Sequence, residues 1–324
     1  MKIIYVLKDA GRCGGHRVVL EHLKGLASRG HDCQLCYIST EPVWFENINF
    51  KLNKCGSIDN LINYLAANKD AIKVATWWET AYWVAKGGGG YYLVQDIETS
   101  RYHDENYKNN VLNTYKLGLH HIVENAFTYA VLRYVLNVGV TRVGLAVDHS
   151  IFKPLGTGKE PSTGLYFYRS DLDSLKNPKL MGDTMSIMRD NNFKLYSYGL
   201  GRCPFASESF ISIPDNRLAE IMNQSEVFIS TSIHEGFCLP LLESMACGTP
   251  VITTNAIGNE IFCINGVNCL TVENNVELKE AIIRILNDKD LAKRLSDNCI
   301  ETANNYQWGK VIDRLENLYV NRVH

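Results

Sequence analysis

The chain has 324 residues, of which 46% are hydrophobic and 21% are charged. This balance is typical of globular proteins, and the length is sufficient for two domains of ordinary size. A formal charge of −2 excludes the basic excess expected of a nucleic-acid-binding protein, so any anion must be held by locally placed charges. No apolar run approaches the length of a membrane span, and the opening apolar segment is too short for a signal peptide. We therefore expect a soluble, cytoplasmic protein.

The chain contains ten cysteines, and two of them form a C-x-x-C pattern at Cys33 and Cys36. The surrounding residues resemble a strand, and no second pair follows at the spacing of a zinc ribbon. Small buried thiols that stay reduced in the cytosol are the simpler interpretation.

Strand and helix patterns alternate through residues 1–147. The segments expected to be strands are Lys2–Lys8, Cys33–Ser39, Lys73–Trp77, Tyr91–Gln95, His121–Val123 and Arg142–Ala146. The segments expected to be helices are Arg17–Ser28, Ser57–Asn68, Glu79–Lys86, Asn106–Leu119 and Ala126–Asn137. Such alternation predicts a doubly wound parallel sheet, so residues 1–147 are expected to form a first Rossmann-like domain. We interpret Gly87–Gly90 as a mobile loop, because no helix follows it.

Proline and glycine interrupt the alternation in residues 148–162, where we place an interdomain linker. A second alternating series in residues 163–305 predicts a second Rossmann-like domain. Its expected elements include the strands Leu165–Tyr168, Lys194–Tyr198 and Val227–Thr231, and the helices Pro178–Arg189 (capped by Asn177), Asn216–Asn223 (capped by Asp215), Val276–Asn287 and Asp290–Asn304. A last helix in residues 306–324 is a candidate to pack back toward the first domain. A cleft between the two domains is expected at the carboxyl ends of their strands.

The stretch from Ser230 to Thr254 has the clearest local pattern. It predicts a strand end, a glycine-containing loop, a short helix and another strand. Pro240 suits the first helical position and Gly248 suits the position just past the end, so we expect a helix of about two turns beginning near Leu239.

The start of this helix is expected to bind an anion. Its free N–H groups, with those of Phe237 and Cys238, favour a group such as a diphosphate. Glu235 and Glu243 stand eight positions apart around the same loop. Since eight helical residues rise roughly 12 Å, the two carboxylates can face opposite ends of a long ligand.

The string Glu235-Gly-Phe-Cys-Leu-Pro-Leu-Leu-Glu243, followed by Ala246–Ile252, resembles the E-x7-E signature of the family 4 glycosyltransferases. These are retaining enzymes of the GT-B fold, with two Rossmann-like domains that face a cleft. Further segments resemble the same family, so the resemblance covers most of the chain: Gly14-Gly15, Gly30-His31, Gly144–Pro154, Gly258–Glu260 and Asn265-Gly266. Ala75–Tyr82 and Tyr92–Glu98 look like the rhamnosyltransferase-like branch that builds bacterial surface polysaccharides.

The resemblance implies a nucleoside-diphosphate-sugar donor and gives several residues a role. Arg169 and Lys176 resemble the pair of cations that holds the diphosphate. The spacing is about one residue longer than expected, so Lys179 is an alternative to Lys176. Glu243 resembles the carboxylate that binds the nucleotide ribose, and Glu235 resembles the one that contacts the transferred sugar.

Other candidate residues surround these charged groups. Backbone groups of Gly236, Phe237, Cys238 and Leu239 are expected to contact sugar and phosphate, without thiol chemistry at Cys238. Gly14 and Gly15 would let the first domain close onto the diphosphate.

Asp96 follows the expected strand Tyr91–Gln95. We predict that it orients the acceptor or acts as a weak base, with Glu98 as the alternative.

The predicted function is a retaining glycosyltransferase that transfers a sugar from a nucleoside-diphosphate-sugar to a glycan or lipid-linked acceptor. Alternatives are a nucleotide-sugar epimerase of the same fold and a catalytically degenerate sugar-nucleotide-binding module. Asp171-Leu-Asp173 resembles the metal motif of the other major glycosyltransferase fold, but it follows a strand in the second half of the chain. We therefore predict no metal or other cofactor. Peripheral contact with the inner face of a membrane is left as an option for reaching a lipid-linked acceptor.

Overall fold

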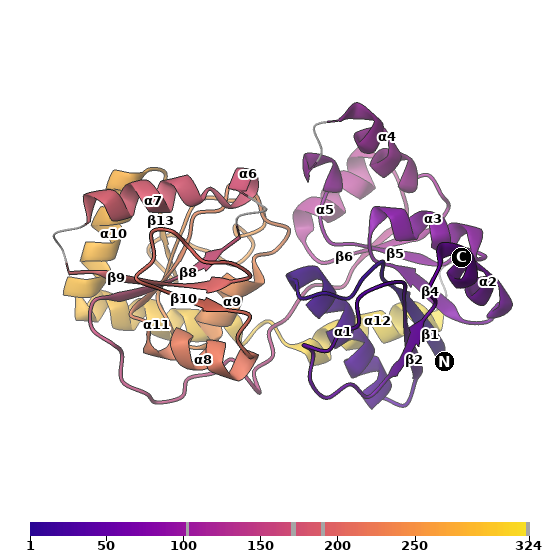
Figure 1. Ribbon diagram of the computed structural model, residues 1–324, viewed down its shortest axis with the longest axis horizontal. Coiled ribbons are helices and arrows are strands. Elements are labelled where there is room, and N and C mark those ends of the chain that lie inside the picture. Colours follow the sequence, from indigo (N-terminus) through magenta and orange to yellow (C-terminus); the bar gives the residue numbers. More distant parts are fainter. Residues whose placement is uncertain (102–103, 170–172, 189–191, 322–324) are drawn as a thin grey trace. The chain divides into compact units, whose positions relative to one another are not determined.

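The computed structural model describes residues 1–101, 104–169, 173–188 and 192–321. The chain divides into two compact units, one formed by Met1–Leu145 with Trp308–His324 and the other by Ala146–Gln307. Figure 1 shows that each unit has a central sheet with helices on both faces. The segment 148–162, expected as a linker, lies within the second unit.

The first unit contains, among its described residues, a seven-stranded sheet in the order β3-β2-β1-β4-β5-β6-β7, and all its pairs are parallel. Its strands are β1 (Lys2–Val6), β2 (Asp32–Tyr37), β3 (Lys51–Lys54), β4 (Ile72–Ala75), β5 (Tyr91–Val94), β6 (His120–Val123) and β7 (Val140–Arg142). Its helices are α1 (Gly14–Ser28), α2 (Ile58–Ala67), α3 (Trp78–Lys86), the 3₁₀ helix η1 (Glu98–Arg101), α4 (Glu105–Thr114), α5 (Ala126–Ala130), the π-helix η2 (Val131–Val135) and α12 (Trp308–Asn321).

The second unit contains, within the described ranges, a six-stranded parallel sheet in the order β10-β9-β8-β11-β12-β13. Its strands are β8 (Thr163–Tyr168), β9 (Lys194–Gly199), β10 (Glu208–Ile211), β11 (Val227–Ser230), β12 (Val251–Thr253) and β13 (Leu270–Thr271). Its helices are α6 (Asp173–Lys176), α7 (Pro178–Ile187), α8 (Asp215–Gln224), α9 (Leu239–Ala246), α10 (Asn275–Asn287) and α11 (Lys289–Ala303). Two parallel doubly wound α/β sheets confirm the predicted fold class.

The strand order reverses once in each sheet, between β1 and β4 and between β8 and β11. Chain connections leave to opposite faces at such a point, so a crevice opens at the carboxyl ends of the two strands, where α/β proteins bind ligands. The segments after β8 and β11 carry Arg169 and the Ser232–Glu235 loop.

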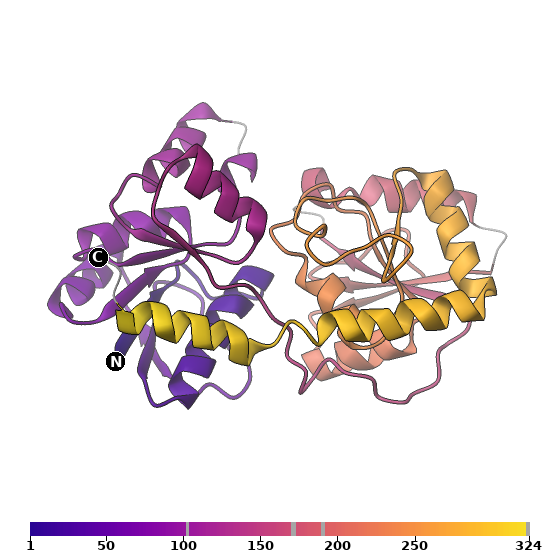
Figure 2. The ribbon, with the colours of Figure 1, turned by 180° about the vertical axis from the view of Figure 1, so that it is seen from behind.

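The last helix, α12, belongs to the first unit and lies along its sheet beside α1 (Figure 2). The hydroxyl groups of Tyr319 and Tyr5 lie 2.7 Å apart, and both side chains are buried. A Cβ atom on Gly25 would lie 2.6 Å from the side chain of Ile312, so a glycine is needed for this close approach of the two helices. Arg29, at the end of α1, extends the contact by ion pairs with Asp313 and Glu316 of α12.

Some boundaries differ from those expected from the sequence. Asp215 was expected to cap α8, but Pro214 occupies the N-cap position and Asp215 is the first helical residue. The helix expected over 126–137 divides into α5 and a π-helical turn. The short strands β3 and β10 were not predicted, because both lie at sheet edges and carry polar residues without a buried face.

All ten cysteines are free thiols, and Cys33 and Cys36 are buried in β2. Among the described residues, no helix combines the length and the apolar composition needed to cross a membrane.

Candidate functional site

The loop after β11 holds the segment between α6 and α7 in place. The Thr231 hydroxyl donates to the carbonyl oxygens of Lys176 and Asn177, at 2.9 and 3.0 Å. The Ile233 N–H donates to the Leu175 carbonyl at 2.8 Å. These bonds fix Lys176 next to the loop that leads into α9. Asn177 accepts from the Leu180 N–H and caps α7, as its sequence position predicted.

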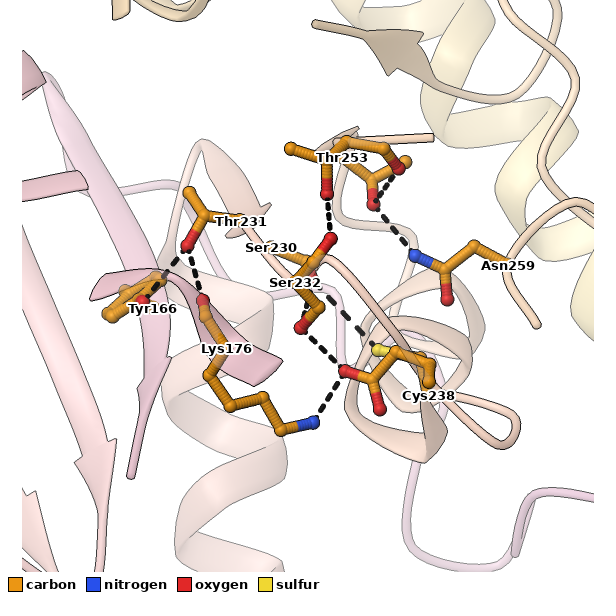
Figure 3. Close-up of polar contacts among 10 residues, drawn as sticks. Tyr166, Lys176, Ser230, Thr231, Ser232, Cys238, Thr253 and Asn259 are labelled. Carbon is orange, nitrogen blue, oxygen red and sulfur yellow. Dashed lines mark hydrogen bonds and ion pairs between the residues drawn. The ribbon is translucent and has the colours of Figure 1, made fainter. Parts of the chain in front are cut away.

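An ion pair between Lys176 and Glu235 is the centre of the site (Figure 3). Lys176 Nζ donates to Glu235 Oε1 at 2.5 Å, and the Ser232 hydroxyl donates to the same oxygen at 2.6 Å. The two charged side chains are only 13% and 9% exposed, so water weakens their attraction less than at an open surface. Within the described part of the chain, Glu235 Oε2 accepts no hydrogen bond. The ion pair is therefore fixed in position, and one carboxylate oxygen of Glu235 can still accept a hydrogen bond from a ligand.

Gly258 sets the position of the Glu235 backbone from the other side. The Glu235 N–H donates to the Ile257 carbonyl at 3.0 Å, which brings the two loops together. A Cβ atom on Gly258 would lie 2.3 Å from the Glu235 carbonyl oxygen, and its φ is +99°. No other residue fits this position without moving Glu235. Ser232 and Gly258 are thus positioning residues to which sequence reasoning gave no role.

The start of α9 presents backbone donors beside this pair. Cys238 is the N-cap with φ +50°, and its carbonyl accepts from Leu241 and Leu242. The N–H groups of Phe237, Cys238 and Leu239 donate to no acceptor within the described residues. Burial raises the pKa of the Cys238 thiol, so its thiolate is disfavoured. This end of α9 can therefore bind an anion through its backbone.

Two further charged candidates lie at the same edge of the second sheet. Glu243 is buried on α9, one helical turn after Leu239. Arg169 directly follows β8 and is half-buried.

Lys179 differs from Lys176 in its surroundings. Its side chain is 81% exposed and pairs with Asp183, one turn further along α7, at 2.5 Å. The structure therefore brings Lys176 to Glu235 and directs Lys179 to the surface of its own helix. Asp171 of the Asp171-Leu-Asp173 pattern lies outside the described residues.

In the first unit, Gly14 and Gly15 are the first residues of α1. A Cβ atom on Gly15 would lie 2.8 Å from the Gln95 side-chain oxygen, and Gln95 Nε2 donates to the Gly15 carbonyl at 3.1 Å. The absence of a side chain at Gly15 thus already has a structural reason, namely the packing of α1 against the segment after β5.

Three carboxylates are buried at the carboxyl ends of β5 and β6: Asp96, Glu98 and Glu124. Glu98 accepts from the Trp78 N–H at 3.2 Å and from the Tyr92 hydroxyl at 3.3 Å, so it stabilises the start of α3. Asp96 accepts from the Ile97 N–H at 2.8 Å.

Glu124 was not identified from the sequence. Its Oε1 has no hydrogen-bond partner among the described residues. Burial raises its pKa to about 8, and the charge of Asp96 adds to the increase. The sequence did offer a signal, because Glu124 immediately follows an expected strand, as Asp96 does. These two strands are adjacent in the sheet, so both residues lie at one of its edges.

Replacing Glu124 with glutamine is expected to flatten the pH dependence of stability. The folded-state pKa of about 8 lies above the ordinary value of 4.5, so the folded protein holds a proton that the unfolded chain releases. Wild-type stability therefore falls as the pH rises from about 4.5 to 8, by up to about 1.4 kcal/mol per pH unit. Thermal unfolding midpoints at pH 5, 6, 7 and 8 test this, with exposed Glu105→Gln as the control. Parallel curves for wild type and Glu124→Gln would contradict it.

Comparisons with known proteins place this geometry in context. Residues 209–302 match the family model described as Glycosyl transferases group 1. An uncharacterized glycosyltransferase of Methanocaldococcus jannaschii is 30% identical over 159 residues, which are 46% of this chain and 42% of that protein. The UDP-Gal:alpha-D-GlcNAc-diphosphoundecaprenol alpha-1,3-galactosyltransferase of Escherichia coli is 31% identical over 111 residues, or 33% of this chain and 28% of that protein. The chain therefore matches less than half of the length of each of these relatives.

Solved structures resemble the chain over nearly its whole length. Sucrose-phosphate synthase from Thermosynechococcus elongatus has a TM-score of 0.81 at 16% identity, with 99% of both chains covered. HepE of Anabaena, in complex with UDP and glucose, has a TM-score of 0.83 at 12% identity, with 99% of this chain and 100% of that chain covered. The chain thus has the GT-B fold, and its residues 209–302, which include Glu235 and Glu243, match Glycosyl transferases group 1.

Proposed function

We propose that the chain is a retaining glycosyltransferase that transfers a sugar from a nucleoside-diphosphate-sugar to a glycan or lipid-linked acceptor. The Lys176–Glu235 ion pair carries this proposal, because it lies at the switch point of the second sheet next to the N–H groups at the start of α9. Glu235 also lies within residues 209–302, the segment that matches a glycosyltransferase family model.

Lys176 and Arg169 are proposed to hold the diphosphate. An ammonium group has three N–H donors, and Glu235 uses one of those on Lys176, so two can reach phosphate oxygens. Negative charge grows on the diphosphate as its bond to the sugar breaks. Fixed cations and the backbone N–H groups of Phe237–Leu239 stabilise that charge without rearranging.

The two glutamates are proposed to bind the neutral parts of the donor. Glu235 Oε2 is available to accept from hydroxyl groups of the transferred sugar, while Oε1 stays bonded to Lys176 and Ser232. Glu243 is proposed to accept hydrogen bonds from the nucleotide ribose. Charged acceptors suit this role, because their hydrogen bonds are stronger than those of neutral groups.

The proposed reaction is a front-face displacement. The bond between the anomeric carbon and the phosphate oxygen breaks, and the acceptor hydroxyl oxygen bonds to the same face of the anomeric carbon. The proton of that hydroxyl passes to the departing phosphate oxygen. Asp96 of the first unit is proposed to orient the acceptor hydroxyl. No metal is included, and full activity in EDTA is expected.

A panel of UDP-, GDP-, dTDP- and ADP-sugars tests the donor assignment, with thermal shift and product analysis as readouts. UDP-sugars come first, because the similar HepE structure contains UDP. A dTDP-rhamnose arm tests the rhamnosyltransferase-like branch. We expect at least one donor to stabilise the protein and to give a product whose anomeric configuration matches the donor. Stabilisation by no donor would refute the proposal, and a product that stays nucleotide-linked would indicate an epimerase.

A further inference from the structure

A groove of about 660 Å³ lies in the first unit at the amino ends of its strands. Residues leading into β4, β5, β6 and β7 line it, including the glycine run that precedes β5. Asp96 and Glu124 follow the carboxyl ends of β5 and β6. Because the strands are parallel, the groove lies at the opposite edge of the sheet from these carboxylates.

The charged side chains that line the groove are predominantly basic. Lys69, Lys73 and Lys116 contribute to it, against the single acidic residue Asp70. Lys69 and Lys116 are exposed, and neither forms an ion pair within the described part of the chain. Since the chain as a whole has a formal charge of −2, this excess of positive charge is local.

Lys73 is a buried cation without a carboxylate. It is 3% exposed, and its Nζ donates to the Gly87 carbonyl oxygen at 2.8 Å. In the described residues it has no ion-pair partner. Burial lowers the pKa of Lys73, because desolvation disfavours its charged form. An anion in the groove would offset that cost.

The glycine run Gly87–Gly90 packs against Lys73. Gly88 and Gly90 have φ values of +105° and +146°. A Cβ atom on Gly88 would lie 3.1 Å from Lys73 Nζ, and one on Gly90 would lie 2.3 Å from the Lys73 carbonyl oxygen. A side chain on Gly88 would cover the ammonium group, and one on Gly90 would clash with the backbone of Lys73. The run expected to be a mobile loop is thus packed closely on Lys73.

His121 is a neutral side chain in the same lining. Its Nδ1 lies 3.1 Å from the Gly139 carbonyl oxygen and must donate to it, which leaves Nε2 as the acceptor nitrogen. Nε2 is buried and has no partner among the described residues. Burial lowers the pKa of His121 to about 4, so the ring is neutral at pH 7. The nitrogen is enclosed by the protein, so the ring forms a neutral part of the groove wall and adds no charge to it.

We propose that this groove binds a small phosphate monoester. The lysines bind its phosphate group. The site is separate from the donor site and does not depend on the proposed function.

Isothermal titration of the full chain with glucose 6-phosphate, inorganic phosphate and glucose tests the proposal. We expect glucose 6-phosphate and inorganic phosphate to bind, and glucose not to bind. The double variant Lys69→Ala/Lys116→Ala should weaken binding at least about tenfold, since two charge-assisted contacts are removed. Lys73→Met should also weaken it. Lys54→Ala, an exposed lysine on β3 outside the groove, is the matched control.

Binding must also persist in Lys176→Ala, which separates the groove from the donor site. Equal affinity for glucose, no binding of either phosphate compound, an unchanged affinity in the double variant, or loss of binding in Lys176→Ala would each overturn the proposal. The double variant removes only exposed side chains, so the test stands even if Lys73→Met does not fold.

Discussion

Replacing Lys176 with alanine is expected to reduce kcat for sugar transfer at least about 100-fold, or about 2.7 kcal/mol of transition-state stabilisation. The variant removes the ammonium group proposed to hold the diphosphate. It also leaves the partly buried carboxylate of Glu235 without its cation, so a negative charge would face the donor phosphates. Initial rates with the donor found in the panel, at saturating concentration, provide the measurement.

Lys179→Ala is the matched control for this prediction. Lys179 lies three residues along the chain, but it is mostly exposed and pairs with Asp183. Exposed i,i+4 ion pairs contribute only a few tenths of a kcal/mol, so activity within about twofold of wild type is expected. A larger loss in Lys179→Ala than in Lys176→Ala would reverse the assignment of the diphosphate lysine.

Replacing Glu243 with alanine is expected to weaken nucleotide binding at least about 30-fold, or about 2 kcal/mol. This estimate follows from the loss of hydrogen bonds to a charged acceptor, each worth about 1.5–3 kcal/mol. Titration with the nucleoside diphosphate alone isolates this effect, because this product of the transfer keeps the ribose and the diphosphate but has lost the transferred sugar. The variant Glu235→Ala should change this affinity less, since Glu235 is assigned to the sugar.

The control for Glu243→Ala is Glu220→Ala, which removes an exposed glutamate from α8. Its unfolding midpoint and nucleotide affinity are expected to match wild type. If Glu243→Ala binds the nucleoside diphosphate as tightly as wild type, the ribose assignment fails. A lower midpoint of the unliganded variant with unchanged affinity would assign Glu243 to the stability of α9.

Local sequence chemistry was sufficient to predict α9. Pro240 marks the start of a short helix and Gly248 marks its end. In the structure the helix spans Leu239–Ala246, and Gly248 follows it with φ +72°. Asn177 likewise caps α7 as expected. These features depend on residues within a few positions of one another, so the local sequence is sufficient to specify where each helix begins and ends.

Contacts between distant segments could not be predicted in the same way. Asp96 and Glu124 each follow an expected strand, but the sequence does not show that these two strands are adjacent in the sheet. The choice between Lys176 and Lys179 depends on Thr231, whose hydroxyl holds the Lys176 carbonyl. Spacing alone left both lysines as candidates, because both follow the same strand.

The position of α12 has a consequence for the order in which the protein is completed during synthesis. Residues 1–145 leave the ribosome first, yet Tyr5 and the α1 face around Gly25 are covered by residues that follow the entire second unit. The second unit is continuous in sequence and can fold as it emerges, whereas the first must wait with an uncovered apolar face. Slow or interrupted translation of residues 146–307 therefore prolongs the interval in which the first unit is prone to aggregate.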